Sequence, residues 1–294
     1  MLHSLHVEAT SRCTLGCPRC ERTNFIDKFG KNNFAINDLN INSFETFVDT
    51  KVKNINFCGN LGDPIYHRNF IDLVNVSKSF SETISITTNG SRKPKSWWKE
   101  LVSILRTNDS VKFSIDGLPS NFDTYRINGD WKTIKQGIEI CTQNNVKTTW
   151  KYIPMAFNEN DIETAKALST DLGIDYFMLD PSDRWEINDS FRPTGNYIGS
   201  KDEVKQNFKK YNKRDVDIDP ECADLTMHYI SADGLYAPCC HSKHYTWWYR
   251  SDWWKNKMSI DSNSLTDCIR RFEDFYATIQ DSKPDYCLFS CGKC

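Results

Sequence analysis

The chain has 294 residues, of which 26% are charged and 39% hydrophobic, and its formal net charge is −2 at pH 7. This length is enough to bury the core of one large domain with an appendage. The nearly balanced charge excludes the basic surface of a nucleic-acid binder, and no run of about 18 apolar residues is present to span a membrane. A secretory signal is also missing at the N-terminus, so we expect a cytoplasmic protein without membrane partners.

Twelve cysteines are many for a protein expected in the cytoplasm. Without a secretory signal, metal or redox chemistry accounts for these thiols better than a disulfide framework does. The cysteines gather towards the two ends of the chain, which predicts two separate metal sites. Cys58 and Cys141, in the middle, lie in apolar patterns that predict packing in the core.

Short apolar segments alternate with segments of helical spacing as far as Leu179. The helical segments include Phe70–Val76, Trp97–Leu105, Ile134–Cys141 and one that ends at Leu172. This alternation predicts an α/β fold with a parallel sheet and outer helices. Six strands rather than eight predict a partial (β/α)6 TIM-like barrel, open on one side. The predicted strands are Leu5–Ala9, Ile55–Cys58, Ile84–Thr88, Val111–Ile115, Lys147–Ile153 and Ile174–Leu179.

The pattern changes after Pro181. Residues 186–220 are polar and mixed, and from Cys222 the chain is rich in Cys, Trp and Tyr with little helical periodicity. A region with so little apolar periodicity is expected to need a metal to fold. We therefore predict a barrel over residues 1–185 and a small metal-binding domain over residues 186–294.

The first predicted strand runs directly into Cys13, Cys17 and Cys20, whose spacing is C-x3-C-x2-C. Three thiolates hold three corners of a 4Fe–4S cube and leave the fourth iron open to activate a small molecule. The loop follows a strand, and barrels of this type carry their chemistry at the C-terminal ends of the strands. A structural zinc site is the alternative, but zinc needs four ligands in a closed tetrahedron.

The spacing of these cysteines after a short first strand resembles that of the radical S-adenosylmethionine (SAM) enzymes. The resemblance implies that the open iron binds SAM, and that an electron from the cluster cleaves SAM to methionine and a 5′-deoxyadenosyl radical. It also implies an oxidoreductase-type enzyme whose electron donor is a protein such as a flavodoxin or ferredoxin.

Motifs similar to those of the family follow the later strands. Gly62-Asp63 resembles the Gly-Gly-Glu-Pro-like segment that receives the amino group of SAM. Ser114, in a Ser-x-Asp-Gly segment, and the later Arg126 resemble the residues that hold the SAM carboxylate, which suits the forked guanidinium.

Three further positions are candidates for contacts with SAM. The residue before the third cysteine, usually aromatic in the family, is Arg19, whose plane is able to stack on adenine. Asn89 and Asn158 follow strands and are candidates for ribose or methionine contacts, although turn formation is an equally good interpretation. The SAM-binding residues implied are Arg19, Gly62, Asp63, Asn89, Ser114, Arg126 and Asn158.

The C-terminal cysteines form a second pattern. Cys222 is followed by Gly234 and Cys239 with the spacing C-x11-G-x4-C, and the chain ends in C-x3-C-x2-C. This resembles the SPASM and twitch domains, and the number of cysteines implies one auxiliary 4Fe–4S cluster. A zinc site made by the same thiolates is the alternative. The implied ligands are Cys222, Cys239, Cys291 and Cys294, with Cys240 and Cys287 as alternates.

Three functions are left open by these patterns. The first is modification of a peptide or protein by hydrogen-atom abstraction, as in many SPASM members. Many of those enzymes carry a leader-binding domain before the barrel, whereas here the first strand begins within a few residues, which weakens this option. The second is oxidation or rearrangement of a small metabolite. The third is a non-catalytic iron–sulfur or zinc protein, in which Gly62-Asp63, Ser114 and Arg126 match by coincidence.

Overall fold

The computed structural model describes residues 1–194, 197–199, 217–218, 227–240, 251–282, 287 and 291–293. Two of the expected ligands of the second metal site, Cys222 and Cys294, lie outside these residues. Within the described ranges, no helix combines the length and the apolar character needed to cross a membrane.

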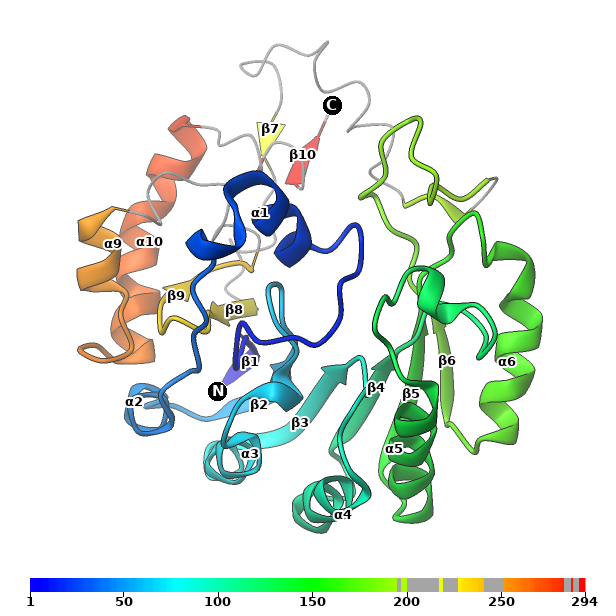
Figure 1. Cartoon of the computed structure of the whole chain (residues 1–294). Coiled ribbons are helices and arrows are strands. Elements are labelled where there is room, and N and C mark those ends of the chain that lie inside the picture. Colours follow the sequence, from blue (N-terminus) through cyan, green and yellow to red (C-terminus); the bar gives the residue numbers. More distant parts are fainter. Residues whose placement is uncertain are drawn as a thin grey trace.

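The main sheet has eight strands in the order β6-β5-β4-β3-β2-β1-β8-β9 (Figure 1). Every neighbouring pair from β6 to β8 is parallel, and the sheet does not close on itself. The predicted partial barrel of an α/β fold is therefore confirmed, with all six expected strands. Their bounds are β1 Leu2–Val7, β2 Val52–Phe57, β3 Ser81–Thr88, β4 Ser110–Ser114, β5 Lys147–Tyr152 and β6 Tyr176–Leu179.

Two strands from the C-terminal part extend this sheet beyond β1. Strand β8 (Met227–Ile230) is parallel to β1, and β9 (Tyr236–Ala237) folds back antiparallel to β8. A separate antiparallel pair joins β7 (Asp217–Ile218) and β10 (Gly292–Lys293). The region expected to form a second domain thus adds strands to the barrel sheet, and the boundary at residue 185 is still only an expectation.

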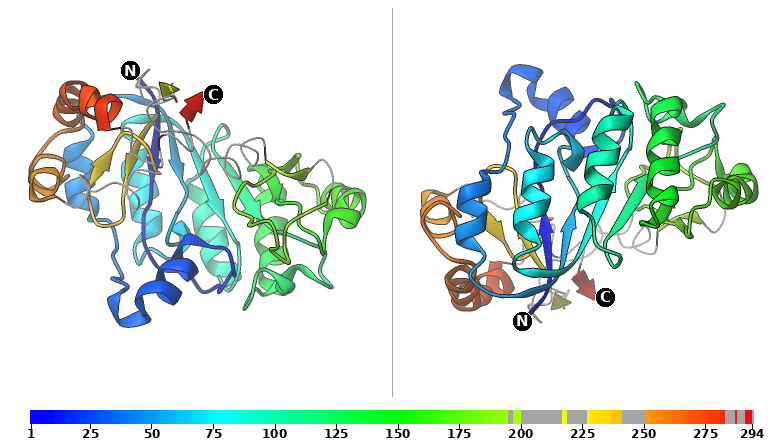
Figure 2. Two further views of the ribbon diagram at one scale, coloured as in Figure 1. Left: turned by 90° about the horizontal axis from the view of Figure 1, so that it is seen from above. Right: turned by 90° about the horizontal axis from the view of Figure 1, so that it is seen from below.

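Helices α2 to α6 line up across one face of the sheet, as Figure 2 shows in its right-hand view. In α4 the buried residues Trp98, Leu101 and Val102 follow helical spacing and so share the face towards the strands. Helix α1 has no buried residue and therefore no apolar stripe to reveal it in the sequence. The bounds are α1 Glu21–Phe29, α2 Ile41–Phe47, α3 Phe70–Ser77, α4 Lys95–Ile104, α5 Trp131–Gln143, α6 Ile162–Asp171, α9 Asp252–Lys257 and α10 Leu265–Ser282.

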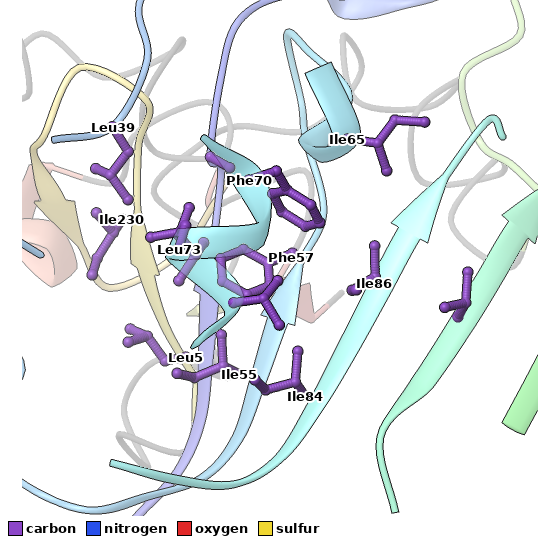
Figure 3. Packing of buried hydrophobic residues seen from close by; sticks show 14 of the residues in the cluster. Leu5, Leu39, Ile55, Phe57, Ile65, Phe70, Leu73, Ile84, Ile86 and Ile230 are labelled. Atoms are coloured by element: carbon purple, nitrogen blue, oxygen red, sulfur yellow. The ribbon is translucent and has the colours of Figure 1, made fainter. Parts of the chain in front are cut away.

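The main core lies between this helical layer and the sheet. Alternate residues of each strand point into it, because successive side chains of a strand point to opposite faces. Burying each large aliphatic or aromatic side chain contributes about 1.5–3 kcal/mol. Figure 3 shows part of this core, with side chains from β1, β2, β3, β8 and α3: Leu5, Ile55, Phe57, Phe70, Leu73, Ile84, Ile86 and Ile230.

The opposite face of the same strands is polar. Asn54 and Asn56 of β2 lie opposite Thr83 and Ser85 of β3, and their amide oxygens accept hydrogen bonds from these hydroxyls at 3.0 and 3.1 Å. On β5, Lys151 alternates with buried core residues and is half-buried on this polar face. The two faces of one sheet therefore separate an apolar core from a polar inner surface.

Candidate active site

The three N-terminal cysteines lie where β1 ends, at the C-terminal edge of the sheet. Cys17 is buried, whereas Cys13 and Cys20 are half-buried. The loop turns on itself through a hydrogen bond from the Cys20 amide to the Cys17 carbonyl at 3.1 Å, and Cys20 is the N-cap of α1. All three thiols therefore belong to one short loop at the mouth of the partial barrel.

Polar side chains from two other strand ends contact the sulfurs of this loop. Asn89 follows β3, and its Nδ2 donates to Cys13 Sγ at 3.7 Å. Arg126 lies beyond β4, and its Nη1 donates to Cys17 Sγ at 3.9 Å. Hydrogen bonds to cysteine sulfurs tune the potential of a bound cluster. Segments far apart in the sequence thus meet at the cysteines.

A small apolar cluster includes Cys17 and packs against the half-buried Cys13 and Cys20. Its members come from the cysteine loop and from the segments that follow β4, β5 and β6. In surroundings this apolar, electrostatic interactions are stronger than in water. The buried members are Leu15, Cys17, Tyr125, Ile153, Met155 and Trp185.

The surroundings disfavour free thiolates at Cys13 and Cys17. Burial raises the pKa of Cys13 to about 12, and the nearby Asp63 carboxylate adds to the rise. Burial also raises the pKa of Cys17, although Arg126 opposes the change. A coordinated metal deprotonates a thiol outright. These residues therefore fit a group that brings its own positive charge.

Arg126 is the buried cation of the site. Its Nη2 lies 2.7 Å from Asp116 Oδ2, and the two side chains are 16% and 0% exposed. Burial lowers the pKa of Arg126, but Asp116 and Cys17 raise it by more, so the guanidinium stays charged. Among the described residues, its buried Nε has no hydrogen-bond partner. An unpaired N–H on a permanent cation beside the thiols fits an anionic ligand such as a carboxylate.

Gly62 and Asp63 hold the loop after β2 against the cysteine loop. A Cβ at Gly62 would lie 2.0 Å from the Thr10 carbonyl oxygen, so only glycine fits. The Asp63 carboxylate accepts from Thr88 Oγ1 at 2.8 Å and from the Asn89 amide at 2.6 Å. Burial raises the pKa of Asp63 to about 6, although these hydrogen bonds lower it. Asp63 thus joins the loops after β2 and β3, and its contact with SAM stays a prediction.

Arg19 is held by the segment that follows β6. Its Nε and Nη2 lie 2.5 and 3.2 Å from the two carboxylate oxygens of Asp189. The guanidinium carbon is 5.8 Å from the centre of the Phe191 ring. A bidentate pair of this kind fixes the plane of the guanidinium. The expected stacking of Arg19 on adenine would have to use this fixed plane.

The last two predicted SAM contacts differ in their accessibility. Ser114 ends β4 on the polar face, opposite Lys151, and is half-buried. Asn158 is completely buried, and its side chain accepts from the Met155 amide at 2.6 Å and donates to the Ile153 carbonyl at 3.1 Å. This geometry corresponds to the turn-forming interpretation of Asn158.

The described C-terminal cysteines lie near one another. Cys239 and Cys240 share a side-chain hydrogen bond, and Cys287 interacts electrostatically with Cys239 and Cys291. In the part of the chain that the structure describes, none of these four cysteines forms a disulfide. Nowhere in the described ranges do three His, Cys, Asp or Glu side chains group closely enough to hold a single metal ion. The ligand set of the second site stays a prediction, and two of its members, Cys222 and Cys294, lie outside those ranges.

Two buried carboxylates have roles that the sequence pattern did not assign. Asp116 is the ion-pair partner of Arg126. Glu8 accepts from the Leu61 amide at 2.5 Å and from the Tyr229 hydroxyl at 2.7 Å, which joins β8 to the loop after β2. The sequence contains a signal for each of them. Asp116 precedes a glycine at the end of a strand, and Glu8 alternates with apolar residues in the first predicted strand. Both positions indicate a carboxylate that points inward.

Comparison with known families gives one match, to a family model described as the radical SAM superfamily, over residues 7–170. A curated protein of Pyrococcus furiosus, described as the tungsten-containing aldehyde ferredoxin oxidoreductase cofactor-modifying protein, is 31% identical over 116 residues. That match covers 40% of this chain and 31% of the relative, so the chain matches about a third of the length of that protein.

Several solved structures share the fold. Streptococcus suis SuiB bound to S-adenosylmethionine has a TM-score of 0.61 at 15% identity, over 88% of this chain and 67% of SuiB. The anSMEcpe structure with bound AdoMet has a TM-score of 0.58 at 14% identity, over 90% of this chain and 80% of that one. SuiB bound to its precursor peptide SuiA has a TM-score of 0.62 at 14% identity, over 90% of this chain and 63% of SuiB. At these identities the likeness establishes the fold.

Proposed function

Because this chain belongs to the radical SAM superfamily, whose cofactors are SAM and a 4Fe–4S cluster, we propose that it forms a 5′-deoxyadenosyl radical and abstracts a hydrogen atom from a peptide or protein. The cluster, when bound, supplies the electron that cleaves SAM. Cys13, Cys17 and Cys20 are the proposed cluster ligands. The observation that carries the proposal is the contact of Asn89 and Arg126 with two of these sulfurs, at the C-terminal edge of the sheet.

The surrounding residues have distinct proposed roles. Arg126 is charged, and its buried Nε has no partner within the described ranges, so it is the proposed partner of the SAM carboxylate. Gly62 lets the backbone of the loop after β2 approach the cysteine loop closely. The apolar cluster that packs against the cysteines limits the access of water on that side, and its proposed role is to protect a reactive radical from side reactions.

A peptide substrate is supported by the polar inner face of the sheet. Asn, Thr and Ser side chains cover this face and offer hydrogen-bond partners to the backbone of an extended chain. Two proteins of the same fold have been solved with peptides, SuiB with the precursor peptide SuiA and anSMEcpe with the Cp18Cys peptide.

A small polar metabolite or cofactor is the second candidate substrate. The ion pair between Lys151 Nζ and Asp180 Oδ2, at 2.8 Å, leaves both side chains partly exposed where β5 and β6 end. Such charged groups suit a hydrophilic small molecule. The relative from Pyrococcus furiosus, described as cofactor-modifying, points in the same direction.

We also propose a SPASM/twitch-like auxiliary cluster, bound by Cys222, Cys239, Cys291 and Cys294. The proximity of the described cysteines Cys239 and Cys291 to Cys287 supports it. An electron donor such as a flavodoxin or ferredoxin and a cytoplasmic location complete the proposal.

The test of SAM cleavage is anaerobic reconstitution with iron and sulfide, followed by reduction with dithionite in the presence of SAM. We expect 5′-deoxyadenosine from the wild-type chain and none from Cys13→Ala, Cys17→Ala or Cys20→Ala. Cys141→Ala, in a buried position of α5, is the matched control and should retain the activity. A wild-type chain with an intact cluster that forms no 5′-deoxyadenosine would refute the proposal.

The substrate class is tested by adding size-separated peptide and metabolite fractions of a cell extract to the reduced enzyme. A peptide substrate predicts that only the peptide fraction raises 5′-deoxyadenosine above the level found with SAM alone. Stimulation by the small-molecule fraction instead would favour the second candidate.

A further inference from the structure

Cys58 is a half-buried thiol that the proposed SAM site does not use. It directly follows β2, and its amide donates to the Val7 carbonyl at 3.3 Å. The apolar pattern around it predicts a place in the core, but the structure leaves it half-buried and beside His6. The His6 Nε2 lies 2.5 Å from the Cys58 carbonyl oxygen, and the imidazole also hydrogen-bonds the thiol.

The C-terminal segment reaches this position after leaving β9. Asn60, two residues beyond Cys58, donates from Nδ2 to the Cys240 carbonyl oxygen at 3.0 Å. Cys240 packs against the main core, and its thiol interacts electrostatically with that of Cys58. The loop that carries Cys58 thus contacts the C-terminal segment at Cys240.

The C-terminal thiols continue from this point as a connected group. Cys240 is hydrogen-bonded to Cys239, and Cys287 interacts with both Cys239 and Cys291. Clustered thiols in a reduced protein are the typical ligands of iron–sulfur clusters and zinc. Cys58 is the member of this group that comes from the barrel.

We propose that Cys58 is a ligand of the second metal centre, which therefore joins the barrel to the C-terminal segment. This inference rests on the proposed second centre but not on the chemistry at the first. The thiolate of Cys58 binds the metal, and the hydrogen bond from His6 orients it. Thiolate ligation is common to an iron–sulfur cluster and to zinc, and metal analysis distinguishes the two.

The test uses the full-length chain with Cys13, Cys17 and Cys20 all changed to Ala, which isolates the second centre. This triple variant is reconstituted anaerobically with iron and sulfide. Iron, sulfide and zinc per chain are then measured, together with the electron paramagnetic resonance spectrum after reduction. Cys58→Ala and Cys58→Ser are each added to this background. Cys141→Ala and Cys268→Ala, at two buried thiols, are the matched controls.

We expect Cys58→Ala to lose most of the metal that the triple variant holds. Cys58→Ser, which conserves the shape of the side chain, should retain more metal but shift the resonance spectrum, because oxygen replaces sulfur. The two controls should match the triple variant. If zinc instead of iron is held and is lost with Cys58→Ala, the assignment of Cys58 stands with zinc as the metal.

Unchanged metal content and spectrum in both Cys58 variants would overturn the inference. A triple variant that binds neither iron nor zinc would also overturn it, because no second centre would exist. Circular dichroism of each variant distinguishes loss of metal from loss of fold. If the alanine variant unfolds, the metal content and spectrum of the serine variant decide whether Cys58 is a ligand. Formation of 5′-deoxyadenosine by the wild-type chain is measured separately, so failure of the proposed function is recognised independently.

Discussion

Arg126 and Asp116 form a buried ion pair, with Nη2 2.7 Å from Oδ2, and the same guanidinium reaches the sulfur of Cys17. One carboxylate thus holds a cation between the end of β4 and the cysteine loop. Asp116 occupies one edge of the guanidinium, and Nε, which no described residue contacts by a hydrogen bond, is left for a ligand. The pair therefore links the stability of the fold to the proposed binding of SAM.

Arg126→Gln should destabilise the protein, since it leaves the Asp116 carboxylate buried without its cation. Loss of one partner of a buried pair costs about 3–5 kcal/mol. Anaerobic urea denaturation measures the change in the free energy of unfolding. The double variant Arg126→Gln/Asp116→Asn should recover more than half of the loss, and strictly additive losses would contradict the pairing.

Arg126→Lys should keep the charge but lose the forked geometry. A hydrogen bond to a charged group contributes about 1.5–3 kcal/mol, so SAM binding should weaken by about 10- to 100-fold. Equilibrium binding of SAM to the reconstituted protein measures this change. An unchanged affinity would show that the carboxylate of SAM is held elsewhere.

Gly62→Ala should displace the loop after β2, because its Cβ would lie 2.0 Å from the Thr10 carbonyl oxygen. Overpacking of this kind costs about 1–3 kcal/mol, and 5′-deoxyadenosine formation should fall with it. Gly16→Ala is the matched control within the cysteine loop, where the nearest atom to an added Cβ is 3.9 Å away. Equal losses in the two variants would count against the close approach at Gly62.

Asp63 should give the metal-free chain a pH-dependent stability. Its pKa is raised from 3.8 to about 6, mainly by burial, so between these values the folded chain holds a proton that the unfolded chain has released. The contribution of this group is fully present below pH 3.8 and is lost as the pH rises through about 6. The loss amounts to at most about 3 kcal/mol.

Asp63→Asn tests this titration. The difference in unfolding free energy between wild type and variant should fall as the pH is raised from about 4 to 7, because only the wild type titrates. Denaturation at several pH values measures the slope. Asp123→Asn, at an exposed carboxylate, is the control. A difference that is independent of pH would refute the raised pKa.

Asp189→Ala should release the guanidinium of Arg19 from its fixed plane. The Arg19 side chain is 38% exposed, so stability should fall by no more than about 1 kcal/mol. If Arg19 contacts the adenine, SAM binding should weaken by about three- to tenfold while the iron content stays constant. Glu163→Ala, at an exposed position of α6, should leave both quantities unchanged. Unaltered SAM binding in Asp189→Ala would remove Arg19 from the SAM site.

Local patterns predicted the strands well because most of them are short segments in which apolar residues alternate with polar ones. In Ile84–Thr88 and Val111–Ile115, alternation and a following glycine mark both the strand and its end. Helix α1 was not predicted because it buries no residue, and β8 was not predicted because its pairing with β1 spans most of the chain. Pairing between distant segments leaves little trace in local periodicity.

The sequence by itself determined the chemistry that this protein brings together: three closely spaced thiols, a glycine–aspartate loop, a distant arginine and a cysteine-rich C-terminal part. Spacing along the chain is enough to identify ligands within one short loop, because residues that are only a few positions apart cannot lie far from one another in space. Only the tertiary structure decided that Asp116 neutralises Arg126, that Asp189 orients Arg19, and that the loop after Cys58 contacts Cys240. These relationships join segments brought together by the parallel sheet, and no local pattern encodes which strand ends become neighbours.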